Sequence, residues 1–490
     1  MISSPFRLAL AGLLLSAALA GCSSKDQQAQ AAAAQAETEY QQGRYKAALQ
    51  SIQTALGARD DVSDYWLMAG RISLALQDYA GAFSAFQNVY QMDRSNIEAL
   101  RQLCQLGLNV QRPDLVDDYA DQLLLLNPGD PMPLVMKGGA ALQRADSVSA
   151  LDFAEKVLAA NPADLNALIL KGQVLASRGE DMAAARIIEP TIGSGGDPAA
   201  RLDLLRRIYK KSGDQRAYER VMRMRAQTNP DERQAQLDWA DWLYQTNRSD
   251  EGLRVLERLM KKRAHDADLS SLIVELWLDA GPKALSSAQI MDGRNVSVEM
   301  KAAFARYANE TNRPQLAIAL LNGGLASATP SPANSDALAS LAYALSLHGR
   351  KEEGQKIIQD VLERDEGQPL ALLTRARLRL AAGKLPGALA DARKLVADNP
   401  LNPTARLLLC TILLQQKEDI LAESSLREGL RALPDSVRLA SRLASLLARS
   451  GRKDDAQSIV RDFGRAAPVS PRARELMSQY QVTLPSPSAA

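Results

Sequence analysis

Residues that carry most enzyme chemistry are scarce in this sequence. Its 490 residues include two histidines, His265 and His348, and three cysteines. Neither histidine has the spacing of a metal site or a catalytic triad, and the sequence has no phosphate-binding loop, nucleophile elbow or dinucleotide fingerprint. We therefore expect no enzymatic activity, no cofactor, no bound metal and no small-molecule substrate.

An excess of charge of either sign is also lacking. Lys and Arg number 59, against 57 for Asp and Glu. A balanced chain has no large field to attract a polyanion, so nucleic-acid binding is not expected. The basic runs at residues 206–211 and 261–263 are most simply solvated helix faces.

Strand-forming residues are few. Aromatic residues make up 4% of the chain, Ala and Leu supply most of the apolar side chains, and no run of Val, Ile and Thr occurs. This composition predicts helix nearly throughout. After residue 26, no window is apolar enough to span a membrane.

The N-terminus has the pattern of an export signal. Arg7 precedes an uninterrupted apolar stretch from Leu8 to Ala18. About 11 apolar residues are too few for a membrane-spanning helix, which needs roughly 20, but they suit a secretory signal. Residues 1–21 are therefore predicted to be a signal peptide.

Cys22 follows this signal where bacterial lipoproteins carry their lipid. The sequence Leu19-Ala20-Gly21-Cys22 closely resembles the lipobox. The resemblance implies cleavage before Cys22 and acylation of that residue, with residues 22–28 as a lipidated tether. Ser23 implies sorting to the outer membrane, where we expect the chain to face the periplasm. The alternative is an ordinary cleaved signal with a chance cysteine.

The rest of the chain repeats with a period of 34 residues. Asn127-Pro128 and Asn161-Pro162 are one period apart, and Asn229-Pro230 and Asn399-Pro400 fall on the same steps. If the first unit begins at residue 29, position 8 is Ala, Gly or Cys in ten of thirteen units, and position 20 is Ala, Gly or Ser in ten of thirteen. Small residues at these two positions let paired helices approach closely. Gly recurs at position 15, where a helix end readily takes a left-handed conformation. The period therefore predicts a stack of helix pairs.

This pattern resembles the tetratricopeptide repeat (TPR), most clearly in the second unit. Trp66, Gly70, Tyr79, Ala82 and Phe86 occupy positions 4, 8, 17, 20 and 24 of that unit, as in the family. The resemblance implies an all-α superhelical solenoid of about 13 repeats with a C-terminal cap helix.

A loss of regularity in one segment divides the mature chain into two regular arrays. We expect an N-terminal array of about seven repeats at residues 29–266, irregular repeats at 267–334, and a C-terminal array of about four repeats at 335–470. A cap helix and disordered tail follow at 471–490. Helix-breaking residues are dense within 267–334, so this segment is either a hinge or a rigid irregularity. Residues 193–196 form a second, milder break.

Cys104 and Cys410 both occupy position 8, in the third and twelfth units. Repeats of a solenoid contact only their neighbours, so we expect no disulfide between these cysteines. Both are predicted to be small core residues.

A protein or peptide partner would bind the concave face, which first helices line in this family. The family's groove positions give Arg71, Arg101, Gln105, Asn109, Gln143, Asn166, Gln173 and Ser177. Amides could bond an extended peptide backbone and arginines could pair with carboxylates. The alternative is that any solvated groove is polar. Further along, Arg207, Lys210 and Lys211 are expected to face Asp241, Glu275 and Asp279, as recognition or as internal charge balance.

These features predict a lipid-anchored scaffold that binds protein partners in the bacterial envelope, in exopolysaccharide export or envelope complex assembly. The pathway is an analogy with other TPR lipoproteins. The alternative is a periplasmic chaperone-like module that holds exported polypeptides or assists outer-membrane protein or pilus assembly.

Overall fold

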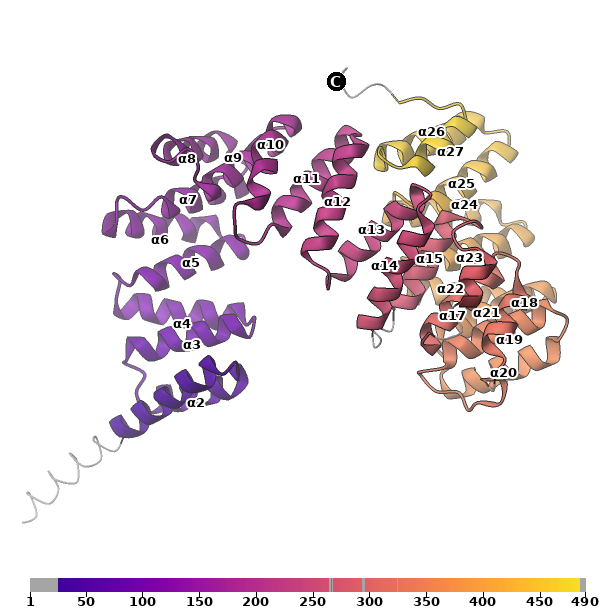
Figure 1. Cartoon of the computed structure of the whole chain (residues 1–490), viewed down its shortest axis with the longest axis horizontal. Helices are drawn as coiled ribbons and strands as arrows, with labels where there is room; N and C mark the ends of the chain where they lie inside the picture. Colours follow the sequence, from indigo (N-terminus) through magenta and orange to yellow (C-terminus); the bar gives the residue numbers. More distant parts are fainter. Residues whose placement is uncertain (1–24, 264–265, 267, 293–295, 324, 485–490) are drawn as a thin grey trace, which may run out of the picture. The chain divides into compact units, whose positions relative to one another are not determined.

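The computed structural model describes residues 25–263, 266, 268–292, 296–323 and 325–484. Cys22, the predicted signal peptide and His265 lie outside these ranges. Over the described residues the chain forms helices joined by short turns, with no strand (Figure 1). None of the described helices is long and apolar enough to cross a membrane.

The chain divides into two compact units, unit 1 at residues 1–196 and unit 2 at residues 197–490. The division follows the glycine-rich segment 193–196 and not the irregular segment 267–334. The predicted N-terminal array therefore extends across both units. Within unit 2 one apolar core continues from Leu237 to Val482, because buried residues persist through the irregular repeats. Whether segment 267–334 is a hinge stays a prediction.

Unit 1 is a stack of helix pairs that begins with a helix at residues 25–41. Residues 25–28 of the predicted tether belong to this helix, since the Gln- and Ala-rich sequence favours helix from its start. The following elements are α2 (Tyr45–Ala58), α3 (Ser63–Ala75), α4 (Tyr79–Met92), α5 (Ile97–Asn109), α6 (Pro113–Leu126), α7 (Met132–Gln143), α8 (Ser147–Ala160), α9 (Leu165–Ser177), α10 (Asp181–Ile188) and the 3-10 helix η1 (Glu189–Gly193).

Unit 2 continues the alternation of first and second helices. Its elements are α11 (Ala199–Ser212), α12 (Gln215–Thr228), α13 (Arg233–Gln245), α14 (Ser249–Lys262), α15 (Leu269–Ala280), α16 (Ser287–Asp292), α17 (Val298–Glu310), α18 (Pro314–Leu321), η3 (Leu325–Ser327), α19 (Ser335–Leu347), α20 (Lys351–Arg364), α21 (Pro369–Ala381), α22 (Leu385–Asp398), α23 (Pro403–Gln415), α24 (Asp419–Ala432), α25 (Val437–Arg449), α26 (Lys453–Ala466) and α27 (Pro471–Gln479). The described helices of the two units make thirteen pairs followed by α27, which confirms the predicted all-α repeat fold and its cap helix.

The turn inside each helix pair has the predicted left-handed residue. Gly43, Gly179 and Gly451 have φ angles of 72°, 80° and 78°. The same conformation occurs at position 15 where the residue is not glycine, as at Gln77 (φ 62°) and Ala145 (φ 60°). The turn geometry of the repeat therefore persists where its preferred residue is absent, and side chains accept the left-handed strain.

Close approach of neighbouring helices, within a pair or between successive first helices, explains the small residue at position 8. A Cβ atom on Gly70 would lie 2.7 Å from the ring of Phe86, and one on Gly138 would lie 2.3 Å from Leu170. On Gly172 it would lie 2.4 Å from Ile188. These glycines leave the space that the neighbouring large side chains fill.

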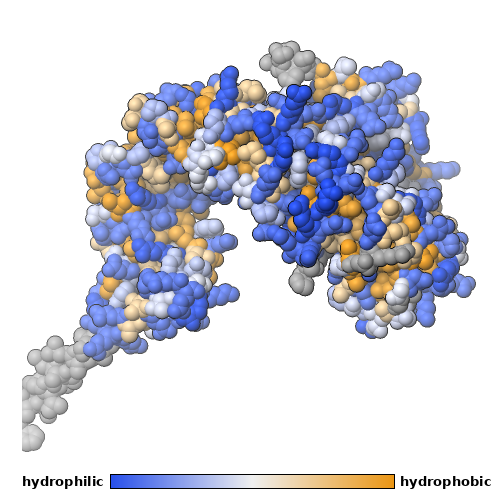
Figure 2. Space-filling model, viewed as in Figure 1, coloured by the Kyte–Doolittle hydropathy of each residue, from blue (hydrophilic) through white to orange (hydrophobic). Residues whose placement is uncertain are grey.

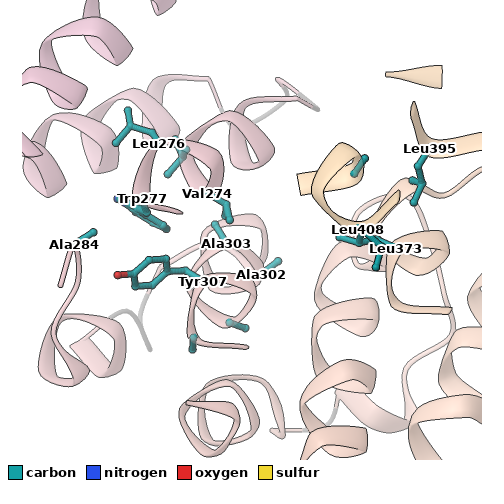
Figure 3. Close-up of a cluster of buried hydrophobic side chains, with 14 of the residues drawn as sticks. Val274, Leu276, Trp277, Ala284, Ala302, Ala303, Tyr307, Leu373, Leu395 and Leu408 are labelled. Atoms are coloured by element: carbon teal, nitrogen blue, oxygen red, sulfur yellow. The ribbon is translucent and has the colours of Figure 1, made fainter. Parts of the chain in front are cut away.

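The irregular repeats keep a core although their second helices are short, with six residues in α16 and eight in α18. Trp277 of α15 is fully buried, and its ring stacks on Phe304 of α17 at a centroid distance of 5.3 Å. Tyr307 lies edge-on to Trp277 at 5.8 Å (Figure 3). Large aromatic side chains thus replace the contacts that longer second helices make elsewhere.

Candidate partner-binding faces

The predicted groove residues lie on α3, α5, α7 and α9, the first helices of unit 1. We call the surface carrying them the first-helix face of unit 1. Both arginines already have carboxylate partners: Arg71 makes two hydrogen bonds to Glu98, and Arg101 Nη2 lies 2.7 Å from Asp130 Oδ2. Sequence reasoning missed Glu98 and Asp130, although an acidic residue 27 to 29 positions after each arginine was a usable signal.

The polar side chains of this face differ in how far they are engaged. Gln143 Nε2 donates to the carbonyl oxygen of Leu108 at 2.7 Å, and Ser177 Oγ donates to that of Val174 at 2.7 Å. Gln105 and Asn109 share one long hydrogen bond of 3.4 Å. Asn166 and Gln173 are exposed, and their side chains have no hydrogen bond within the described ranges. The face retains free amide groups on α5 and α9. Contact of any of these residues with a partner stays a prediction.

Unit 2 differs, because its own C-terminal helices cover part of the face formed by its early first helices. Glu275 of α15 accepts hydrogen bonds from Arg306 of α17, from Thr404 of α23 at 2.8 Å, and from Arg438 of α25. Arg438 Nε also donates to Asp279 at 2.6 Å. These contacts join residues up to 163 positions apart in the sequence. We call Glu275, Asp279, Arg306, Thr404 and Arg438 the closure network.

A second set of polar contacts flanks the closure network. Arg472 of α27 lies 2.9 Å from Asp241 of α13, and Ser470 Oγ donates to Gln245 at 2.7 Å. Gln215 of α12 donates to the carbonyl oxygen of Val469 at 2.6 Å. The first and last repeats of unit 2 are therefore held together by hydrogen-bonded side chains.

Two expectations from the sequence are corrected by these contacts. The premise that repeats contact only their neighbours is wrong within unit 2, because its superhelix closes on itself. Asp241, Glu275 and Asp279 are balanced internally, but by Arg472, Arg306 and Arg438. Lys210, expected to face those carboxylates, lies 3.5 Å from Asp435.

Burial and opposite charge shift the ionisation of the closure network. Burial would raise the pKa of Glu275, but Arg438 and Arg306 outweigh it and hold the pKa below its ordinary value. For Asp279 burial prevails and raises the pKa. Burial would lower the pKa of Arg438, but Glu275 and Asp279 raise it. Arg438 and Glu275 are therefore a charged pair at neutral pH.

A cavity of about 640 Å³ remains inside unit 2. The polar side chains in its lining are Glu310, Thr311, Tyr343, Arg377, Thr404, Thr411, Gln415 and Arg438. Arg377 Nη1 lies 2.6 Å from Glu310 Oε1, and its guanidinium lies 4.9 Å from the ring centre of Tyr343. Most of the charged side chains that line this cavity are thus paired.

The cysteines behave as expected. Cys104 and Cys410 are both buried and both free. Burial raises the pKa of Cys104 to about 12, so its thiol is unreactive at neutral pH.

His348 is the C-cap residue of α19. In the described part of the chain, no group of His, Cys, Asp and Glu is arranged to hold a metal ion.

Comparison with known proteins gives weak overall likeness to other helical-repeat structures. The chain is similar to PilF of Pseudomonas aeruginosa (16% identity, 43% of this chain and 95% of that chain, TM-score 0.33). It is also similar to PilW, a type IV pilus biogenesis factor (18%, 42% and 94%, TM-score 0.35), and to the Naa15/Naa10 complex bound to HypK (13%, 93% and 72%, TM-score 0.34). No curated protein sequence matches the chain. The tetratricopeptide repeat model matches residues 33–97 in unit 1 and 373–437 in unit 2, so both units contain tetratricopeptide repeats.

Proposed function

We propose that this protein is a non-catalytic, lipid-anchored scaffold that binds a protein partner in the bacterial envelope through the first-helix face of unit 1. Its role in exopolysaccharide export or envelope complex assembly, expected from the resemblance, is part of the proposal.

One observation carries this choice of face. In unit 1, the hydrogen bonds of the predicted groove residues join only the same or adjacent repeats, and the amides of Asn166 and Gln173 stay exposed. In unit 2, Arg438 and Arg472 occupy part of the corresponding face by pairing with Glu275 and Asp241. The backbone of an extended peptide has N–H and C=O groups that need hydrogen-bond partners. Exposed amide side chains can both donate to and accept from these groups.

The anchor limits where this face works. Lys25, the first residue of the described helix, follows Cys22 by three positions. Three residues span at most about 10 Å when fully extended. An acyl chain on Cys22 would therefore hold the first repeats next to the bilayer, and each buried methylene adds about 0.8 kcal/mol to membrane binding.

Site-specific crosslinking in intact cells tests the partner face. A photoreactive amino acid at Gln105 or Gln173 is expected to capture the same protein, because both positions lie on the first-helix face. Ala159, an exposed position on the second helix α8, is the matched control. Equal capture from Ala159 would contradict the proposal. Many transient products in place of one stoichiometric partner would favour a chaperone-like module.

Fractionation tests the anchor separately. Wild-type protein is expected to stay with membranes after a high-salt wash, whereas the Cys22→Ser protein is expected to appear in the soluble fraction. A Cys22→Ser protein that remained wholly in the membrane fraction would show that lipid on Cys22 is not the anchor.

A further inference from the structure

Two rows of positive side chains lie on the second helices α12 and α14. The first row is Arg216, Arg220 and Arg223, and the second is Arg254, Arg258 and Lys261, all exposed. Within each row the residues are four and then three positions apart, a spacing that places side chains on one side of a helix. We call these six residues the basic face.

Nearby carboxylates do little to neutralise the basic face. Glu219 lies 2.9 Å from Arg248, and Asp231 lies 2.6 Å from Lys262, both outside the two rows. Burial raises the pKa of Glu257, although Arg254 of the basic face opposes this shift. Asp250 and Glu251 are exposed carboxylates on α14, and Asp250 accepts a hydrogen bond from Gln289. Among the described residues, no carboxylate lies within ion-pair distance of Arg216, Arg223, Arg254 or Lys261, and Glu257 is an electrostatic neighbour of Arg254.

Charge is also divided unevenly between the two units. Residues 25–196 contain 14 Lys and Arg against 21 Asp and Glu, whereas residues 197–490 contain 44 against 36. The near balance of the whole chain therefore conceals an acidic unit 1 and a basic unit 2. In Figure 2 the most hydrophilic side chains gather over α11, α12 and α14. Of the two basic runs, the first lies on α11, and Lys261 of the second belongs to the basic face.

The chemistry of the basic face favours an anionic surface over an apolar one. The exposed large hydrophobic side chains found in the described part of the chain include none from α12 or α14. Binding would therefore depend on charge and not on insertion of apolar groups. Mobile headgroups can match separate cations one by one, whereas an acidic protein patch must fit both rows in register.

We propose that the basic face binds anionic phospholipid headgroups. This inference rests on the proposed function, because the lipid on Cys22 would keep the chain beside such headgroups. Basic residues near an anionic bilayer are attracted to it within about a Debye length, roughly 8 to 10 Å at physiological salt. The basic face would give unit 2 its own contact with the membrane, independent of the N-terminal anchor.

Vesicle cosedimentation tests this inference without the anchor. The mature chain carrying Cys22→Ser is mixed with phosphatidylcholine vesicles, with or without about one third phosphatidylglycerol. We expect binding only to the phosphatidylglycerol vesicles, with affinity at least about tenfold lower when salt is raised from about 50 to about 300 mM. The variant R216E/R223E/R254E/K261E is expected to lose this binding.

The matched control is K351E/K356E/K384E/R393E, which makes the same change in net charge at exposed positions elsewhere in unit 2. It is expected to bind nearly as well as the parent, and circular dichroism checks that both variants are folded. Equal binding to the two vesicle types, equal loss in the control, or binding to soluble polygalacturonate but not to vesicles would overturn the proposal. Because the assay lacks acyl chains, failure here would leave the proposed lipid anchor standing.

Discussion

The Thr404 hydroxyl donates a 2.8 Å hydrogen bond to Glu275, which precedes it by 129 residues. In a simple repeat stack each side chain contacts only its own or adjacent repeats. Together with Arg306 and Arg438, this bond shows that the first-helix face of unit 2 is engaged by the unit's own later repeats.

Removal of Arg438 should strongly destabilise unit 2. Its guanidinium contacts Glu275, Asp279 and Thr404, and its side chain is 18% exposed. Arg438→Met would leave two carboxylates without their main partner, which typically costs about 3 to 5 kcal/mol. We expect urea denaturation to reveal this loss. Arg449→Met, an exposed position on the same helix, should change stability by less than about 0.5 kcal/mol. Equal stability of the two variants would mean that the closure network does not stabilise the fold.

The stabilising effect of Glu275 should depend on pH. Its pKa lies below 4.5 in the folded protein, because two arginines outweigh the effect of burial. A carboxyl group with a lowered pKa stabilises the fold above its unfolded pKa and loses that effect as pH falls through the folded pKa. The difference in unfolding free energy between wild type and Glu275→Gln should therefore be greatest above the unfolded pKa of the carboxyl group, about 4.5, and shrink as pH falls through the lowered folded pKa. A difference that grew on acidification would contradict the assigned ionisation.

Adjacent glycines in α7 should respond differently to the same substitution. A Cβ on Gly138 would lie 2.3 Å from Leu170, whereas one on Gly139 would lie 3.4 Å from Leu108. Gly138→Ala is expected to destabilise unit 1 by about 1 to 3 kcal/mol through overpacking. Gly139→Ala should be nearly neutral or stabilising by up to about 1 kcal/mol, because Ala favours helix over Gly. Thermal unfolding of both variants checks the contrast, and a reversed order would refute the close approach of these helices.

Trp277 should be the most sensitive aromatic residue of the irregular repeats. It is fully buried against Phe304 and Tyr307, and its indole donates a 2.9 Å hydrogen bond to the Tyr244 hydroxyl. Trp277→Ala should cost about 3 to 5 kcal/mol. Trp239→Ala provides a comparison, because Trp239 is only partly buried and should cost less. Similar losses at both positions would show that the aromatic cluster has no special role.

Sequence reasoning predicted the repeat fold well because its signals are local. Small residues at position 8 and glycine at position 15 report packing and turn geometry within one helix pair. The closure of unit 2 left no such signal, since a contact such as Arg438 with Glu275 depends on superhelix curvature added over several repeats. For the same reason sequence reasoning did not predict that Arg472, Arg306 and Arg438 pair with Asp241, Glu275 and Asp279. Gln105 and Gln173 were predicted to lie in a groove from their positions in the repeat alone, and that assignment stays a prediction.

Closure of unit 2 also sets an order of events during folding. Helix pairs can form as soon as their own residues are available, and neighbouring pairs can then extend the stack. The bonds from Gln215 to Val469 and from Ser470 to Gln245 join residues 254 and 225 positions apart, so they must wait for the last repeat. Such distant contacts form slowly, because the chain loses the entropy of a long loop before the contacts stabilise the fold. A chain that ends before Val469 would keep most of its helices but would lack both bonds, so closure of unit 2 is complete only after its last residues have been synthesised.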